Sequence, residues 1–356
     1  MNTAIISALS VFADATVYFP VVDSIALRTL YNPDVFEYSP YGEKTYVMEV
    51  VGGKAGDYNP NVGWEANGSG ASAVFKEHIA DNDRAISFKS DWMANVNAIN
   101  QGQVLPIIKI FKQTIKNFGA EIDAVTFSGI RGFVKEDNVI RGDQFSVENA
   151  FNTILDIETQ AFNNEITDEV FVFVSPQAEA NIKKALVNNN LAANPTVFTF
   201  EVATGLEVKL QSIVYNNLKI VRVPENRFYD FIVVFDAKTP GQESGGYAPT
   251  VDAEVMQALV VPKEAAAVSF RHFIANVAVP QAAMSGANLA LEMVNQELAS
   301  NLNNQVTVQN IGVNQLADAF SINTRTVYGV ETFEVKNHTL YAYYAPTPVV
   351  EEGAGA

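Results

Sequence analysis

The chain has 356 residues, 40 of them acidic and 23 basic, which gives a net charge of −17, and it contains no cysteine. The lack of cysteine excludes disulfide scaffolds, thiolate metal sites and cysteine nucleophiles. The negative charge argues against a protein that grips nucleic acid over its whole surface, because neutralising phosphates requires clustered Lys and Arg. The length predicts about two domains or one large, elaborate one.

Charged residues make up only 18% of the chain and hydrophobic residues 48%, whereas about 25% charge is usual in soluble domains. This composition favours a protein that buries surface against other copies of itself. A surface rich in Asn and Gln would also account for it. No basic n-region of a secretion signal and no apolar run of 18 or more residues is found, so we expect a soluble protein that stays in the cell that makes it.

The first part of the chain lacks the pattern of a packed domain. Residues 1–45 alternate short apolar runs with prolines and show no sustained period, which predicts an extended arm. A strand is predicted over Thr45–Val51, followed by an excursion rich in Gly and Asn that continues to Gly70. A two-stranded excursion of this size cannot bury a core of its own. It must therefore lean on another surface.

The clearest helix is predicted over Leu105–Phe118, where apolar residues recur at the helical spacing. Lys109, Lys112 and Lys116 form a second row beside the apolar stripe. Such a row could face DNA, but a solvated helix face explains it more simply. Two further helices are predicted, over 121–130 and 147–162.

After residue 165 the pattern changes to short apolar strands around one helix. The run Glu169–Val174 is typical of a buried strand, and Ser175 followed by Pro176 is the N-cap signature of a helix that continues to Leu186. Further strands are predicted at 197–202, 206–215, 219–223 and 231–235. This order predicts a compact α/β subdomain over about residues 165–240.

The C-terminal part is predicted to consist mainly of strands. Two are expected at 255–261 and 269–279, around a short Ala-rich turn, and a helix is expected over 288–301. A final hairpin is predicted from 326–335 and 339–344. The tail should be disordered.

No segment of the sequence completes a phosphate-binding, calcium-binding or other metal-binding motif. Val51–Ala55 is similar to a phosphate loop, but Met48 stands where Gly is needed and Ala55 replaces the hydroxyl residue. Asp81–Asp83 opens like a calcium loop, but Ile86 replaces the required Gly. The histidines share no metal-ligand spacing; they are His78, His272 and His338. We therefore expect no enzyme activity and no cofactor.

Ser244, within Gln242–Gly246, is superficially similar to the nucleophile segment of serine proteases. No His lies in a fitting motif, and the surrounding Gly and Pro predict a mobile loop rather than a rigid turn. A hydrolase or carbohydrate-binding protein that uses this loop is the weaker alternative. Loss of a measurable activity in a Ser244→Ala variant would support it.

The stretch Asp83–Met93, a helix after it, and then Ala120–Ser128 together resemble the major capsid proteins of tailed bacteriophages. In that family an Asp-Arg, a Ser-Phe and a nearby Asp precede the long helix, and a Glu-Ile-Asp-Ala opens the peripheral domain. The resemblance spans about residues 40–345. It rests on the order and spacing of its segments, since no single motif is highly specific.

The resemblance implies an α+β, Hong Kong 97-type capsid fold with an N-terminal arm, an extended loop, a spine helix, a peripheral domain and an axial domain. The expected ranges are 1–45 for the arm, 46–80 for the extended loop (a long β-hairpin), 81–165 for the spine helix and first part of the peripheral domain, 166–250 for the axial domain, 251–345 for the return strands of the peripheral domain, with room for an insertion at 281–324, and 346–356 for a disordered tail. Residues 1–45 do not resemble the family's N-terminal scaffolding extension, so we expect a separate scaffolding protein or a chain that starts at its mature end.

The resemblance also implies a structural protein, not an enzyme, that assembles into hexamers and pentamers of an icosahedral head around double-stranded DNA. The implied partners are other copies, scaffolding and portal proteins and, in some members, decoration proteins. No cofactor, no membrane and no sequence-specific DNA contact is implied. The expected location is the virion, after assembly in the host cytoplasm. An encapsulin-type nanocompartment, which holds cargo enzymes, is the alternative with the same fold.

The functional site implied for such a protein is the contact between subunits. We expect these contacts at Lys54, Tyr58, Trp64, Arg84, Lys109, Lys112 and Lys116. Some family members cross-link Lys to Asn between subunits. Lys54 has a suitable place on the extended loop, but no motif identifies its partner.

Overall fold

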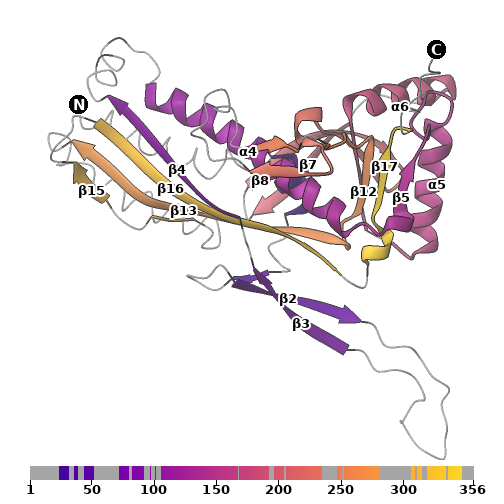
Figure 1. Ribbon diagram of the computed structural model, residues 1–356, viewed down its shortest axis with the longest axis horizontal. Helices are drawn as coiled ribbons and strands as arrows, with labels where there is room; N and C mark the ends of the chain where they lie inside the picture. Colours follow the sequence, from indigo (N-terminus) through magenta and orange to yellow (C-terminus); the bar gives the residue numbers. More distant parts are fainter. Residues whose placement is uncertain are drawn as a thin grey trace, which may run out of the picture.

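The structure is a computed structural model that describes 24–31, 36–38, 44–51, 72–79, 82–91, 97, 101, 106–166, 168–191, 196–203, 206–234, 247–250, 252–280, 306–308, 311–314, 319–333 and 336–346. These residues form a seven-stranded sheet with helices on both faces, a second and longer sheet, and a projecting hairpin (Figure 1). The predicted α+β class is confirmed.

The seven-stranded sheet lies at one end of the molecule (Figure 1). Its strands, in spatial order, are β5 (Val139–Arg141), β17 (Tyr341–Tyr344), β12 (Ala258–Pro262), β6 (Val170–Val174), β9 (Leu218–Arg222), β8 (Leu206–Tyr215) and β7 (Thr196–Ala203). The central strand β6 is parallel to β9 and antiparallel to β12. Every residue of β6 and of β12 is buried, as expected for strands that are covered on both faces.

Four helices cover the two faces of this sheet. On one face lie α5 (Ala150–Asn163) and α6 (Pro176–Asn188), and on the other lie α2 (Ile25–Leu30) and α4 (Pro106–Phe133). Alternation along β6 produces two cores, because successive side chains of a strand point to opposite faces. Phe171 belongs to the core under α2 and α4, and its neighbours in β6 belong to the core under α5 and α6.

The second sheet is built on three long antiparallel strands. It consists of β13 (Ala266–Pro280), β16 (Ala319–Thr332) and β4 (Asn82–Asp91), with β14 (Val306–Val308) and β15 (Ile311–Asn314) paired to β13. The strand β16 lies between β13 and β4. Figure 1 shows this sheet running beside α4, from the seven-stranded unit to the opposite end of the molecule.

A hairpin of β2 (Lys44–Val51) and β3 (Ser72–Ile79) projects away from both sheets (Figure 1). At its base, β1 (Phe36–Tyr38) pairs with β2, and Lys76 Nζ lies 2.7 Å from Glu331 Oε1. The remaining elements are short: β10 (Ile232–Val234), β11 (Tyr247–Pro249), and the 3-10 turns η1 (Glu136–Asn138), η2 (Glu225–Arg227) and η4 (Asn337–Thr339).

The predicted helices over 105–118 and 121–130 are one continuous helix of 28 residues, α4. Gly119 lies between the two predicted helices, and glycine weakens a helix in isolation. In the structure this turn is buried against the rest of the fold, with Phe118 4% and Ala120 7% exposed. Tertiary packing therefore keeps the turn helical.

Two predictions are wrong. Ile25–Leu30, predicted within an extended arm, forms the helix α2, because its apolar side chains find a core to enter. The predicted final hairpin does not form, since β16 and β17 belong to different sheets and the turn η4 lies between them.

The strands of the seven-stranded sheet are not confined to the range 166–250. The strand β5 precedes this range, and β12 and β17 follow it. The predicted helix 288–301 and the tail beyond residue 346 lie outside the described residues.

Candidate functional site

Of the seven residues predicted at subunit contacts, Arg84 is the one whose side chain the structure describes. Lys54, Tyr58 and Trp64 lie outside the described residues. The backbone of the three lysines Lys109, Lys112 and Lys116 lies in α4, but their side chains are outside the described part.

Arg84 lies in β4 and forms a two-pronged ion pair with Glu121 of α4. The Nε atom lies 2.7 Å from Oε1, and Nη2 lies 3.2 Å from Oε2. A third contact comes from β16, where the hydroxyl of Tyr328 lies 3.5 Å from Oε1. The side chain of Glu121 is only 4% exposed, and that of Arg84 is 30% exposed. The pair joins the strand that follows the hairpin to the long helix of the same chain.

Burial raises the pKa of Glu121 from 4.5 to about 7, because removal from water disfavours the charged form. The charge and hydrogen bonds of Arg84 act in the opposite direction, as does Tyr328. The carboxyl of Glu121 therefore titrates near neutral pH.

Asp123 is fully buried and connects three segments that are distant in sequence. Its Oδ1 accepts hydrogen bonds from Ser24 Oγ at 2.7 Å and from the Ala26 N–H at 2.9 Å. Its Oδ2 lies 3.0 Å from Nη1 of Arg227 in η2. Burial raises the pKa of Asp123, and Arg227 and the donors of α2 oppose this rise. The carboxylate thus fixes α2 and η2 to α4.

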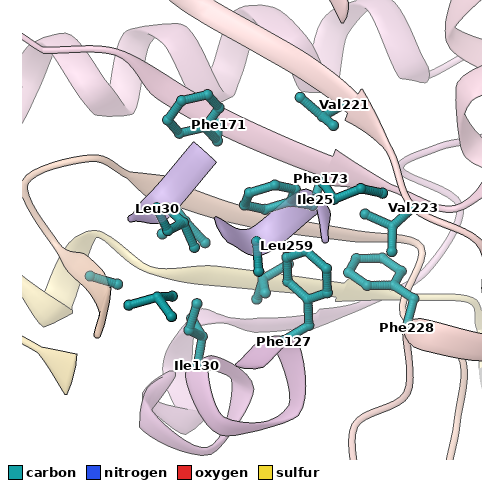
Figure 2. Close-up of a cluster of buried hydrophobic side chains, with 14 of the residues drawn as sticks. Ile25, Leu30, Phe127, Ile130, Phe171, Phe173, Val221, Val223, Phe228 and Leu259 are labelled. Atoms are coloured by element: carbon teal, nitrogen blue, oxygen red, sulfur yellow. The ribbon is translucent and has the colours of Figure 1, made fainter. Parts of the chain in front are cut away.

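An apolar core continues the same contact (Figure 2). Ile25 and Leu30 of α2 lie among aromatic side chains from α4, β6 and the segment after η2. The ring of Phe127 lies 4.7 Å from that of Phe173 and 5.7 Å from that of Phe228, measured between centroids. Such tilted and perpendicular ring pairs contribute beyond their buried area.

The last turns of α4 are fixed as well. Ser128 donates a hydrogen bond to the carbonyl of Asp230 at 3.1 Å. Arg131 Nε donates to the Tyr344 hydroxyl at 2.7 Å, and burial raises the pKa of that hydroxyl to about 12. We call residues 121–131 of α4, with these partners, the junction. It joins the two sheets and the N-terminal helix into one body.

The sequence indicated the junction only in part. The segment Ala120–Ser128 was singled out, but nothing pointed to Ser24 or Arg227 as partners. One signal was present: Glu121 and Asp123 stand in an otherwise apolar helical stretch, which is a costly arrangement unless both carboxylates find partners.

The described residues contain no group of three His, Asp or Glu side chains arranged to hold a metal ion. Within the same part of the chain, no helix is long and apolar enough to cross a membrane. His338 is exposed in η4, and His272 lies in β13, as predicted for a strand residue. The Ser244 loop lies outside the described residues.

No protein-family model and no curated protein sequence matches the chain. Among solved structures, the chain is similar to the head structure of Helicobacter pylori bacteriophage KHP40, over 91% of each chain, at 8% identity and a TM-score of 0.48. It is also similar to the mature capsid of bacteriophage PhiM1, over 85% of this chain and 82% of that one, at 12% identity and a TM-score of 0.42. A virus-like particle from Pyrococcus furiosus is similar over 93% of this chain and 98% of that one, at 7% identity and a TM-score of 0.44.

Proposed function

We propose that this protein is the major capsid protein of a tailed bacteriophage, and that hexamers and pentamers of it close into an icosahedral head around double-stranded DNA. The observation that carries the proposal is the hairpin of β2 and β3, which projects away from the body of the chain (Figure 1). The driving force of assembly is the burial of surface between copies rather than bond chemistry.

In the described part of the chain, no other strand pairs with the outer half of the hairpin. The strand β1 pairs with residues 45–47, and Lys76 reaches Glu331 of β16. Beyond these contacts, Met48–Val51 and Ser72–Phe75 pair with each other. An isolated two-stranded ribbon is marginally stable at best in water. A neighbouring copy supplies the missing surface in a shell.

The resemblance in sequence supports the same function, because its two segments meet in the fold. Arg84 comes from the first segment and Glu121 from the second, and they form the ion pair of the junction. In this proposal α4 is the spine helix, the long sheet belongs to the peripheral domain, the seven-stranded unit is the axial domain, and the hairpin is the extended loop.

The net charge of −17 fits a shell that encloses DNA without gripping it. Any binding of DNA by the free protein should therefore be weak and insensitive to salt. The partners in this proposal are a scaffolding protein, a portal protein and decoration proteins where present. Assembly takes place in the host cytoplasm, and the mature location is the virion.

The test is negative-stain electron microscopy of the purified protein, alone and with its scaffolding protein. The informative variant replaces Met48–Phe75 by Asn-Gly, so that a two-residue turn closes the hairpin after the pair Val47 and Lys76. This variant keeps the contacts of β1 and the ion pair with Glu331. We expect it to fold like the parent, by circular dichroism and thermal unfolding, and to form no shells.

The proposal is supported if the parent protein forms shells, tubes or capsomers and the shortened variant forms none. A parent protein that stays strictly monomeric with its scaffold, and that is not found in virions, overturns it. Homogeneous small shells that contain cargo protein and no DNA indicate the nanocompartment instead.

A further inference from the structure

We propose that copies of this chain join head to tail through α5 of one copy and α6 of the next. This inference rests on the proposed function and names the surfaces that close the ring of subunits. It is carried by opposite charge, by exposed apolar side chains at both helices, and by a groove beside one of them.

The first surface, which we call the acidic edge, is α5 with the turn before it. The segment 142–170 contains seven acidic residues and no Lys or Arg, namely Asp143, Glu148, Asp156, Glu158, Glu165, Asp168 and Glu169. Of these, Asp143, Glu148 and Asp156 are exposed on α5 or just before it. The edge therefore carries a charge that nothing on the same helix neutralises.

The second surface, which we call the basic edge, is α6 with the end of β9. Lys184 is exposed, and Lys183 lies 2.8 Å from Glu179. Arg222 is 63% exposed, with a nitrogen 3.6 Å from the other oxygen of Glu179. Two of these three cations, Lys183 and Arg222, pair with the carboxylate of Glu179, and Lys184 is exposed, which leaves a net positive charge to face another molecule.

Both edges also expose large apolar side chains. On the acidic edge, Phe162 is 83% exposed at the end of α5. Beside it is a groove of about 380 Å³, lined by Glu158, Thr159, Phe162, Ile166, Asn216 and Asn217. On the basic edge, Val187 is 61% and Leu191 39% exposed. Aliphatic side chains of this size fit such a groove, and apolar contacts with a charged rim are typical of interfaces.

The proposed contact joins two different helices, which lie side by side on the same face of the sheet. Viewed down the shortest axis of the molecule, α6 lies along the top edge of the seven-stranded unit and α5 along the right-hand edge (Figure 1). A contact in which each copy uses α5 toward one neighbour and α6 toward the other is heterologous, and such a contact closes into a ring when its rotation closes. Opposite charges across the α5–α6 contact orient the two copies, and repulsion between like charges disfavours α5–α5 and α6–α6 contacts.

The test is a charge reversal with rescue. The single variants Asp156→Lys and Lys184→Glu should each raise the concentration needed for half-assembly by about tenfold or more, measured by light scattering and electron microscopy. The double variant should return to within about threefold of the parent, because the pair is restored with its signs exchanged. Glu136→Lys is the matched control, since it reverses an exposed acid in η1, off both edges, and should assemble like the parent.

A second measurement uses the lack of native cysteine. A Phe162→Cys protein mixed with a Val187→Cys protein should give a covalent dimer with a short bis-maleimide, and neither variant alone should do so. Thermal unfolding of each variant should match the parent, because all four substituted side chains are exposed or partly exposed.

Three results overturn this contact and leave the proposed function standing. They are single reversals that assemble like the parent, a double variant as defective as the single variants, and an assembling protein that gives no mixed dimer. A parent protein that forms neither shells nor rings overturns the proposed function, and this inference with it.

Discussion

The two faces of the seven-stranded sheet bury their helices in different ways. The face under α2 and α4 contains four phenylalanines in contact, and two almost fully buried carboxylates border it. The face under α5 and α6 is packed mainly with Ala, Ile and Val, and the acidic residues of α5 point outward. One face keeps its charges inside and the other presents them to solvent.

The two faces differ in how far apart in sequence the segments that meet on them are. Glu121 is 37 residues from Arg84, and Asp123 is 99 residues from Ser24 and 104 from Arg227. Three remote segments must therefore dock on α4, and we infer that paired buried charges select one arrangement among several apolar ones. The helices α5 and α6 directly flank β6 in sequence, so apolar packing suffices there and their charges are left for another copy.

The largest effect is expected for Asp123→Ala. Removing one member of a buried charge pair takes the partner carboxylate away from Arg227 and from the donors of α2, which should lower the free energy of unfolding by about 3–5 kcal/mol. Urea unfolding of the unassembled protein measures this. Asp156→Ala, on the outer face, is the control and should change the value by less than about 0.5 kcal/mol. Equal losses of unfolding free energy in both variants would contradict the difference between the two faces of the sheet.

The pH dependence of stability should come in part from Glu121. Its pKa in the folded state, about 7, lies above the unfolded value of 4.5, so its contribution is present below pH 4.5 and is lost as the pH rises through 7. Between pH 5 and pH 8 the loss is about 2–3 kcal/mol. Glu121→Gln should flatten this part of the profile. Arg84→Met should steepen it, because Arg84 lowers the pKa; an unchanged slope in both variants contradicts this assignment.

Two glycines of α4 should respond in opposite directions. A Cβ at Gly129 would lie 2.8 Å from Cγ1 of Val330 in β16, so Gly129→Ala should cost about 1–3 kcal/mol. A Cβ at Gly132 would meet no atom within 4 Å, so Gly132→Ala should stabilise the protein by up to about 1 kcal/mol. Thermal unfolding of the pair checks both signs, and a stabilising Gly129→Ala would refute the close approach of α4 to β16.

The smallest effect on folding is expected at the acidic edge. Phe162→Ser should change the free energy of unfolding by less than about 0.5 kcal/mol, because the ring is 83% exposed. Ile157→Val, on the buried side of the same helix, should cost about 1 kcal/mol. A large loss of stability in Phe162→Ser would mean that the ring serves the fold of its own chain rather than a contact between copies.

The sequence alone determined the elements whose signals lie within a few adjacent residues. The strand β8 has the predicted bounds, β6 differs by one residue, and α6 begins after the Ser175 cap, whose side chain accepts a hydrogen bond from the Ala178 N–H. The resemblance to capsid proteins also came from the sequence, through the order and spacing of Asp83–Met93, the helix after it and Ala120–Ser128. Local propensity and capping decide such features, and they are written in the sequence at the place where they act.

Only the tertiary structure decided the rest. The helix α2, the continuity of α4 through Gly119 and the separation of β16 from β17 all depend on partners far along the chain. The same holds for the partners of Glu121 and Asp123: two carboxylates in an apolar helical stretch indicate that partners are needed, but no local signal identifies them. The physical reason is that burial depends on the complete tertiary fold. Two residues of equal local propensity can therefore differ, because only one of them is buried against a partner.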